Sequence, residues 1–237
     1  MALRGIAYGV GVGPGDPELV TLKAVRLIRE NEIIALPGSN PKETTAYRIA
    51  VQAVPELAEK KLLGLSSPMT MDTRTREEGH RQSAELIESY LEQGQNVVYL
   101  TLGDSTVYCT FTYIQHLLEM DGYETELVNG IPSFCAAASR LNIPLAEWNE
   151  AIHILPGMHL DQAVSLPSDG TIVVMKSASR LQAVKSRLQE AGLSVQAVEK
   201  CGMPDEQLYH CTEEIPDDAG YFTLIIAKEN IANDGEV

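Results

Sequence analysis

An apolar run at residues 97–102 constrains the fold of this chain most strongly. Its continuous, β-branched hydrophobicity predicts a buried strand of a parallel sheet. The run ends at Gly103-Asp104-Ser105-Thr106, after which apolar residues recur at helical spacing. Ligands of open α/β sheets bind just beyond the carboxyl ends of the strands, so this turn is a candidate ligand site. The alternative is an ordinary strand-to-helix turn in which Asp104 or Ser105 caps the helix.

A second candidate turn, Gly13-Pro14-Gly15-Asp16-Pro17, follows a strand predicted at residues 5–12. It does not match the dinucleotide-binding fingerprint, which requires glycines at relative positions one, three and six, because the sixth position here is Pro14 or Asp16. Glycines let a ligand approach the backbone closely, and the prolines fix the turn. We expect Asp16 to be the N-cap of the next helix, with Pro17 in its first turn.

Charge and cysteine content exclude several classes of function. The chain has 237 residues, 44% of them hydrophobic, which suffices for one large or two modest domains. A net charge of −15 argues against nucleic-acid binding and means that an anionic ligand needs a local cluster of basic residues. No segment has the length of a membrane span and the N-terminus lacks a signal-peptide pattern, so we expect a cytoplasmic protein. The four cysteines lack zinc-ligand spacing, so we expect reduced thiols and no metal site.

Strand and helix patterns alternate along the chain, which predicts an α/β fold. Strands are expected at 5–12, 32–36, 61–65, 96–102, 125–128, 150–155, 171–175, 195–200 and 221–227. Helices are expected from residue 17 and at 44–54, 72–92, 111–119, 135–139, 162–165 and 179–191. We place a boundary near residues 119–124, which divides the chain into an N-terminal α/β domain at 1–120 and a C-terminal α/β domain at 121–237.

An ordered set of segments between about residues 5 and 228 resembles the tetrapyrrole (corrin/porphyrin) methylases. The segments are GVGPGDPEL at 11–19 with Thr21, LGDSTVY at 102–108, GIPSF at 130–134, Met175-Lys176, and EKCGM at 199–203 with Gln207. Within this family the chain is most similar to the C20-methyltransferases of cobalamin (vitamin B12) biosynthesis, which act on precorrin-2 or cobalt-factor II. Residues 67–72 (SPMTMD) and 108–114 (YCTFTYI) carry that narrower similarity.

The resemblance implies two α/β domains that form a cleft for S-adenosyl-L-methionine, and a homodimer. The resemblance also implies that the protein binds a small-molecule tetrapyrrole substrate, and that it binds no nucleic acid, no membrane and no metal ion of its own. By residue-to-residue match, the implied cofactor-binding residues are Leu102, Gly103, Asp104, Ser105, Thr106, Ile131, Pro132, Ser133, Met175, Gly202, Met203, Thr223 and Leu224. The family usually has Gly-Asp-Pro where this chain has Gly103-Asp104-Ser105, so we expect a less rigid turn that still binds the cofactor.

Methyl transfer from a sulfonium mainly requires alignment of the methyl group with an electron-rich carbon. Asp104 and Tyr108 are the candidate catalytic residues that would take the proton at C20, and His80 is a further candidate base. The alternative for Tyr108 is a core aromatic residue. The substrate carries many carboxylates, so local cations must recognise it. The implied substrate-binding residues are Gly13, Pro14, Gly15, Pro37, Arg74 and Arg76, although an arginine on a helix more often belongs to a solvated face.

Two alternatives remain open on the sequence alone. One is a methylase of the same fold that acts at another ring position, and the other is a non-catalytic sensor of an adenosine ligand. A sensor needs one ligand pocket, whereas a methylase needs a wide trough for a macrocycle beside it. Glycine- and proline-rich rims at 11–17, 36–41 and 66–69 favour the methylase.

Overall fold

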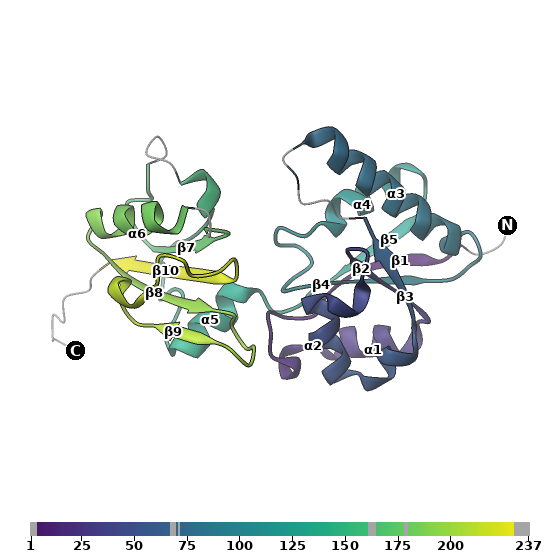
Figure 1. Ribbon diagram of the computed structural model, residues 1–237, viewed down its shortest axis with the longest axis horizontal. Coiled ribbons are helices and arrows are strands. Elements are labelled where there is room, and N and C mark those ends of the chain that lie inside the picture. Colours follow the sequence, from purple (N-terminus) through teal and green to yellow (C-terminus); the bar gives the residue numbers. More distant parts are fainter. Residues whose placement is uncertain (1–3, 67–69, 71, 161–164, 178–179, 230–237) are drawn as a thin grey trace. The chain divides into compact units, whose positions relative to one another are not determined.

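The computed structural model describes residues 4–66, 70, 72–160, 165–177 and 180–229 (Figure 1). The chain divides into two compact units, Met1–Pro132 and Ser133–Val237. Each unit has its own sheet and its own hydrophobic core. Among the described residues, no helix is long and apolar enough to cross a membrane.

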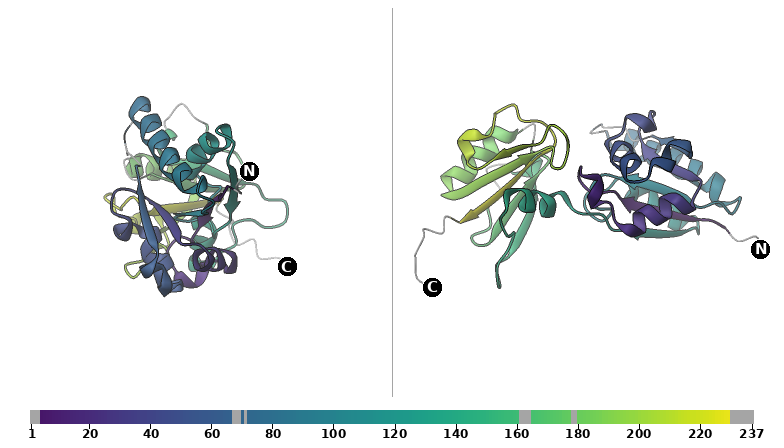
Figure 2. Two further views of the ribbon diagram at one scale, coloured as in Figure 1. Left: turned by 90° about the vertical axis from the view of Figure 1, so that its right-hand side faces the viewer. Right: turned by 90° about the horizontal axis from the view of Figure 1, so that it is seen from below.

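The first unit is a parallel five-stranded sheet with helices on both faces (Figures 1 and 2). The strand order is β3-β2-β4-β1-β5. The strands are β1 Ile6–Gly11, β2 Ile33–Pro37, β3 Lys61–Leu65, β4 Val97–Thr101 and β5 Glu124–Val128. The α-helices are α1 Leu22–Glu30, α2 Thr45–Ala53, α3 Thr73–Leu91 and α4 Phe111–Met120.

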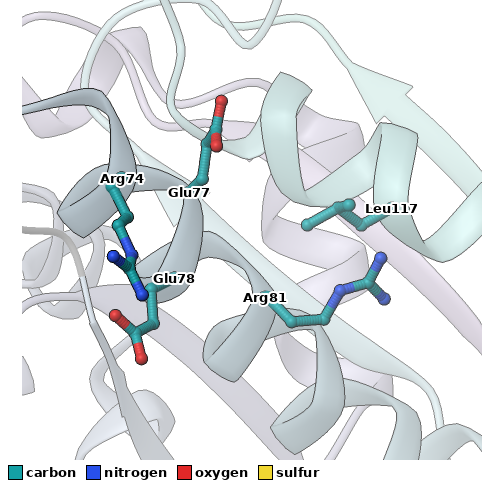
Figure 3. Close-up of a pocket in the computed structure, with 5 residues that line it drawn as sticks. All are labelled: Arg74, Glu77, Glu78, Arg81 and Leu117. Carbon is teal, nitrogen blue, oxygen red and sulfur yellow. The ribbon is translucent and has the colours of Figure 1, made fainter.

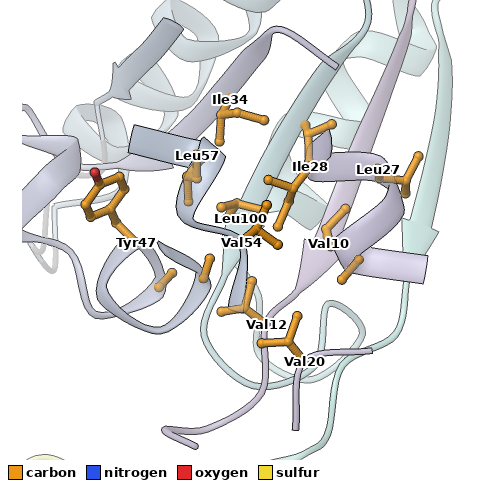
Figure 4. Close-up of a cluster of buried hydrophobic side chains, with 14 of the residues drawn as sticks. Val10, Val12, Val20, Leu27, Ile28, Ile34, Tyr47, Val54, Leu57 and Leu100 are labelled. Carbon is orange, nitrogen blue, oxygen red and sulfur yellow. The ribbon is translucent and has the colours of Figure 1, made fainter. Parts of the chain in front are cut away.

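Alternate residues of the central strand β4 face opposite helical layers. Val98 and Leu100 belong to the core cluster that includes α1 and α2 (Figure 4), whereas Val97 and Tyr99 pack with α3 and α4. Adjacent strands β1 and β4 therefore lead into helices on opposite faces, α1 on one and α4 on the other. Their carboxyl ends form a topological switch point, which is where open α/β sheets bind ligands.

The second unit contains a mixed sheet with strand order β6-β7-β10-β8-β9. Strands β6 and β7 are parallel, and the other neighbouring pairs are antiparallel. Helix α6 packs on one face of the sheet, and α5 contacts β8 and β10. The elements are α5 Ser133–Leu141, β6 Ile152–Pro156, β7 Thr171–Met175, α6 Leu181–Glu190, β8 Leu193–Glu199, β9 Gln207–Tyr209 and β10 Thr223–Glu229.

The two units divide after Pro132, later in the chain than the boundary predicted at residue 120. The difference is strand β5, which pairs in parallel with β1 from Ile6 opposite Glu124 to Val10 opposite Val128. Membership of a sheet is decided by pairing with a distant strand, and no local signal in the sequence marks it.

The start of the first α-helix and the number of strands also differ from the predictions, and one predicted helix is not tested. Asp16 accepts a hydrogen bond from Glu18 N at 2.8 Å, but it begins a 3-10 turn at Pro17–Leu19 and not an α-helix. The α-helix α1 begins after Thr21, whose hydroxyl accepts from Ala24 N at 3.2 Å. Strand β9 was not predicted, because three residues are too short for a periodic pattern. The helix predicted at 162–165 lies outside the described residues except for Ser165.

Candidate functional site

Three loops meet at the carboxyl edge of the first sheet. Gly13 follows β1 and Gly103 follows β4, and they exchange two backbone hydrogen bonds, 3.1 Å from Gly13 N to Gly103 O and 2.8 Å in return. Gly130 follows β5, and a Cβ added there would lie 2.2 Å from Gly103 O. A Cβ on Gly11 would lie 2.5 Å from the same oxygen. Only glycine fits at Gly11 and Gly130, so the three loops pack backbone against backbone at this edge. At Gly103 a Cβ would meet nothing within 4 Å, so there the backbone is open to close approach by a ligand.

Asp104 joins the loop after β4 to the loop after β5. Its buried carboxylate accepts hydrogen bonds from the amide of Thr106 at 2.7 Å, from the Thr106 hydroxyl, from Asn129 Nδ2 at 3.2 Å and from Gly130 N at 3.0 Å. Burial raises the pKa of the Asp104 carboxyl, but these hydrogen bonds outweigh burial and hold the pKa below its usual range. An ionised carboxylate whose oxygens already accept from protein donors is well suited to position the two loops. Its cofactor-binding and catalytic roles stay predictions.

Ser105 stands where the family usually has proline, and it is fully buried. Its hydroxyl donates to Val128 O, at the end of β5, at 3.0 Å. This hydrogen bond restrains the turn in place of the fixed φ of a proline. Neither Asp104 nor Ser105 caps the next helix, because α4 begins at Phe111 with Thr110 as its N-cap. The alternative hypothesis, that this segment is an ordinary strand-to-helix turn in which Asp104 or Ser105 caps the helix, is therefore wrong.

Tyr108 lies in the same loop, with a φ of 50° and 47% of its surface exposed. The alternative that Tyr108 is a core aromatic residue is therefore wrong. A positive φ is uncommon for a residue with a side chain, and such backbone strain clusters at functional sites. Tyr108 therefore remains a candidate catalytic residue, and its exposure and backbone conformation now support that prediction.

The other cofactor residues predicted in the first unit lie at this same edge. Leu102 directly follows β4 and is partly buried, and Thr106 is exposed. Ile131 and Pro132 directly follow Gly130 and are partly buried. Asn129 and Gly130 hold the Asp104 carboxylate but were not predicted as site residues. The glycine of the 130–134 motif was the signal that could have found Gly130.

The predicted substrate-binding residues follow three parallel strands at the same carboxyl edge. Gly13, Pro14 and Gly15 follow β1, and Pro37 is the last residue of β2. Arg74 and Arg76 are exposed in the first turns of α3, after β3. Residues 67–69 and 71 lie outside the described residues. They belong to the segment 67–72 that resembles the C20-methyltransferases, and residues 67–69 also belong to the glycine- and proline-rich rim predicted at 66–69.

Arg74 lines an open pocket of about 510 Å³ between α3 and α4, together with Glu77, Glu78, Arg81 and Leu117 (Figure 3). Two carboxylates and two guanidinium groups line it, and Arg81 is also paired with Asp121. This balance of charge gives a polycarboxylate ligand little net attraction. The pocket is therefore a poor candidate for the main substrate site.

His80, the further candidate base, stacks on Tyr113 of α4 with ring centroids 5.0 Å apart. Burial, together with the nearby Arg76 charge, lowers the pKa of the His80 imidazole. The ring is therefore neutral at physiological pH. Its stacking against α4 places it on the α3–α4 surface and not among the glycine loops.

Five of the cofactor residues predicted in the second unit lie at one edge of its sheet. Met175 ends β7, Gly202 and Met203 follow β8, and Thr223 and Leu224 begin the antiparallel strand β10. The sixth, at position 133, begins α5. The structure thus gathers the predicted residues of the first unit at one edge of its sheet and five of the six predicted in the second unit at one edge of the other sheet.

Two hydroxyls at this edge are buried and have no hydrogen-bond partner within the described residues, those of Thr223 and Ser177. Buried hydroxyls are rarely left without a partner, and such exceptions are expected where a ligand binds. Ser177 was not predicted. A hydroxyl residue just beyond a strand end, in the segment Met175-Lys176-Ser177, was the signal that could have found it.

No metal site is evident in the part of the chain that the structure describes. It contains no group of three or more His, Cys, Asp or Glu side chains arranged to hold an ion. The four cysteines, all of them in described segments, form no disulfide.

The fold and these loops are those of a methylase family. Residues 7–216 match the model of the tetrapyrrole (corrin/porphyrin) methylases, and the chain belongs to this family. The match confirms the resemblance drawn from the sequence. The fold neighbours described below also confirm the α/β fold class.

The chain is similar to the probable cobalt-precorrin-2 C(20)-methyltransferase of Methanocaldococcus jannaschii, with 38% identity over 185 residues, 76% of this chain and 77% of the relative. It is 27% identical to the precorrin-2 C(20)-methyltransferase of Sinorhizobium sp. over 237 residues, 94% of each chain. Uroporphyrin-III C-methyltransferase of Thermus thermophilus shares the fold, with a TM-score of 0.70 and 25% identity over 98% of this chain and 96% of that one. A second structure of the Thermus thermophilus enzyme, complexed with S-adenyl homocysteine, has a TM-score of 0.68 and 24% identity over 95% and 98% of the two chains.

Proposed function

We propose that this chain is an S-adenosyl-L-methionine-dependent methyltransferase that methylates C20 of precorrin-2 or cobalt-factor II in cobalamin biosynthesis. The observation that carries this function is the 38% identity to a relative named as a C20-methyltransferase, spread over three quarters of both chains. A second relative, similar along nearly its whole length, is named for the same ring position on the metal-free substrate. The predicted enzyme class and ring position therefore agree with the names of the relatives.

The residues at the two strand-end edges fit the proposed cofactor. S-adenosyl-L-methionine supplies the methyl group, activated by its sulfonium charge. Gly103 leaves no side chain between a ligand and the backbone of the first unit, since the space where its Cβ would lie is empty. In the second unit, the buried Thr223 hydroxyl has an unused hydrogen-bonding capacity that a polar ligand group could satisfy. A buried polar group with no partner among the described residues gains a hydrogen bond only when a ligand supplies one.

We assign different tasks to the two candidate catalytic residues. The pKa of Asp104 is lowered, burial being outweighed by its hydrogen bonds, so this carboxylate is a weak proton acceptor and serves to position the loops. Tyr108, half exposed on a strained turn, is the residue proposed to contact the substrate near the reacting carbon. Orientation of the methyl group against that carbon is the main contribution expected from the protein.

A homodimer in the cytoplasm is the proposed state of the enzyme. The dimer rests on the family resemblance, and the location is carried over from the expectation stated in the sequence analysis. Analytical ultracentrifugation of the purified protein tests the first, with a mass of twice 25.9 kDa expected. Fractionation of the source cells tests the second.

A methyl-transfer assay with labelled S-adenosyl-L-methionine tests the proposed function. Metal-free precorrin-2 and cobalt-factor II are offered side by side under anaerobic conditions, and the product is analysed for label at C20. Label at C20 from either substrate supports the proposal and identifies the preferred substrate. Label at another ring position contradicts the C20 assignment. Cofactor binding without transfer to either substrate contradicts the enzyme activity and favours a sensor.

A further inference from the structure

The first unit has a group of basic side chains that form no salt bridge with any residue that the structure describes. Five of its Lys and Arg residues form salt bridges with carboxylates, namely Lys23, Arg26, Arg29, Lys60 and Arg81. Two others, Arg4 and Lys61, lie over tyrosine rings. The remaining four are Lys42, Arg48, Arg74 and Arg76, and none has a salt bridge within the described residues.

These four residues share one place in the fold. Lys42 lies in the 3-10 turn Pro41–Glu43 that follows β2, and Arg48 lies in the first half of α2, which starts directly after that turn. Arg74 and Arg76 lie in the first turns of α3, which follows β3. Since β2 and β3 are parallel neighbours, all four residues flank the carboxyl ends of the same pair of strands. All four are exposed.

The two pairs approach this edge from opposite faces of the sheet. Helix α2 packs in the core cluster on one face and α3 in the cluster on the other, as Figure 1 shows. Charges on both sides of the strand ends suit a wide ligand with anionic groups around its rim better than a compact anion. Arg76 donates weakly to Thr73 Oγ1 at 3.4 Å, and Arg74 shares its surroundings with Glu77 and Glu78. Lys42 and Arg48 are therefore the cations with the greater capacity for an external carboxylate.

Basic side chains without a salt bridge are unexpected in so acidic a chain. With 33 Asp and Glu against 18 Lys and Arg, a basic residue has many possible partners in the protein. The segment 38–48 contains Lys42 and Arg48 against one carboxylate, Glu43. Arg74 and Arg76, in contrast, stand among Asp72, Glu77 and Glu78, of which Asp72 is engaged as the N-cap of α3 through Thr75. A local positive field at a ligand-binding edge attracts anionic ligands even when the net charge repels them.

We propose that Lys42 and Arg48 bind the peripheral carboxylates of the tetrapyrrole substrate and determine its affinity and orientation. This inference rests on the proposed function, because it assigns the substrate to the β2–β3 end of the same carboxyl edge. Neither residue was singled out from the sequence. Lysine provides a point charge, and arginine provides a planar fork that matches a carboxylate with two parallel hydrogen bonds.

The test compares the double variant Lys42→Gln/Arg48→Gln with a control of equal charge change, Arg29→Gln/Lys61→Gln. The control residues lie near the opposite edge of the sheet, at the end of α1 and the start of β3. Binding of a polycarboxylate porphyrin and of its neutral methyl ester is followed by fluorescence. We expect the first variant to bind the polycarboxylate about tenfold more weakly, with a smaller dependence on salt, and to bind the ester as the wild type does. The control should behave like the wild type.

Kinetics separate this inference from the proposed function. The Lys42→Gln/Arg48→Gln variant should show a raised KM for the tetrapyrrole, with little change in kcat and unchanged affinity for S-adenosylhomocysteine. The charge-conserving variants Lys42→Arg and Arg48→Lys should recover most of the affinity. Equal weakening in both double variants would overturn the inference and leave the methyltransferase standing. A wild-type protein that binds the polycarboxylate porphyrin but transfers no methyl group would overturn the proposed function instead.

Discussion

The carboxylate of Asp104 accepts a hydrogen bond from the amide of Gly130 at 3.0 Å, although the two residues stand 26 positions apart in the chain. The bond joins the loops after β4 and β5, the two strands that flank β1. Gly11, at the end of β1, packs so closely on both loops that a Cβ there would lie 2.5 Å from Gly103 O and 2.7 Å from Gly130 N. A single acidic side chain therefore joins the loops after β4 and β5, and backbone contacts hold the end of β1 against them.

The Asp104→Asn variant is expected to remain folded but to lose about 1–3 kcal/mol of unfolding free energy at pH 7, and to bind S-adenosylhomocysteine more weakly. An asparagine turns an amide N–H₂ toward groups that are themselves donors. The pKa of Asp104 is lowered in the folded state, so its stabilisation is complete above the unfolded pKa and is lost as the pH falls through the folded pKa. Urea titrations should therefore show a difference from the wild type that shrinks below about pH 4.

Asp16→Asn is the control for this variant, because Asp16 caps only an exposed 3-10 turn. It should cost less stability and leave ligand affinity unchanged. Equal affinity of Asp104→Asn and wild type in calorimetry would rule out a cofactor role for this carboxylate. Equal stability at pH 7 would rule out its role in joining the loops.

The Gly130→Ala variant is expected to lose about 3 kcal/mol of unfolding free energy and to lose ligand binding, because its Cβ would overlap Gly103 O. Gly192→Ala is a useful comparison. Gly192 has a φ of 72°, but a Cβ there would meet nothing within 4 Å. The Gly192→Ala variant should therefore lose only the unfolding free energy that corresponds to the strain of a left-handed backbone, about 1–2 kcal/mol. Denaturant titration of both proteins measures the difference. A cost for Gly130→Ala no larger than that for Gly192→Ala would show that the loops can separate without penalty.

The Thr223→Val variant is expected to weaken S-adenosylhomocysteine binding without lowering the stability of the unliganded protein. Valine has the same shape, and the hydroxyl it removes has no partner in the described part of the chain. Thr171→Val is the matched control, since the buried Thr171 hydroxyl on β7 donates to Leu145 O at 2.5 Å and lies 3.0 Å from Glu150 Oε1. That control should destabilise the protein and leave the affinity unchanged. The prediction fails if Thr223→Val destabilises the protein and binds as tightly as the wild type.

The Glu88→Gln variant is expected to stabilise the protein at neutral pH. Burial raises the pKa of Glu88, and the charge and hydrogen bond of Asp121 raise it further. A raised folded pKa means that the stabilisation is present below the unfolded pKa and is lost as the pH rises through the folded value. The thermal midpoint of Glu88→Gln should therefore exceed that of the wild type at pH 7 and approach it near pH 4. Glu78→Gln, on the exposed surface of the same helix, is the control, and an equal shift in both variants would contradict this explanation.

Elements with a strong local signal are where the sequence predicted them. Helix α3 begins after Asp72, whose carboxylate accepts from Thr75 N at 2.8 Å, and its buried residues Ala84, Ile87 and Leu91 follow the helical period. The apolar run of β4 became the central buried strand of the first sheet. These outcomes depend on capping and hydrophobic periodicity, which act between residues close together in the chain.

The candidate site was predicted in part for the same reason. The glycine-rich turns after β1 and β4 are visible as motifs, and the structure brings Gly13 and Gly103 into direct backbone contact. That Lys42 and Arg48 form no salt bridge within the described part of the chain has no sequence signal, because it depends on which carboxylates lie near each cation after folding. The Ser177 hydroxyl, which has no hydrogen-bond partner among the described residues, is likewise recognised only from its burial in the folded chain.

The sequence by itself determined the family, the positions of most helices and strands, and the turns that carry the chemistry. Tertiary structure alone decided that β5 joins the first sheet, that Asp104 bonds to Asn129 and Gly130 instead of capping α4, and that Tyr108 is exposed. The physical reason is the range of the interactions. Caps and periodic patterns join residues within a few positions of one another, whereas strand pairing, burial and the partners of a buried carboxylate depend on groups that only the folded chain brings together.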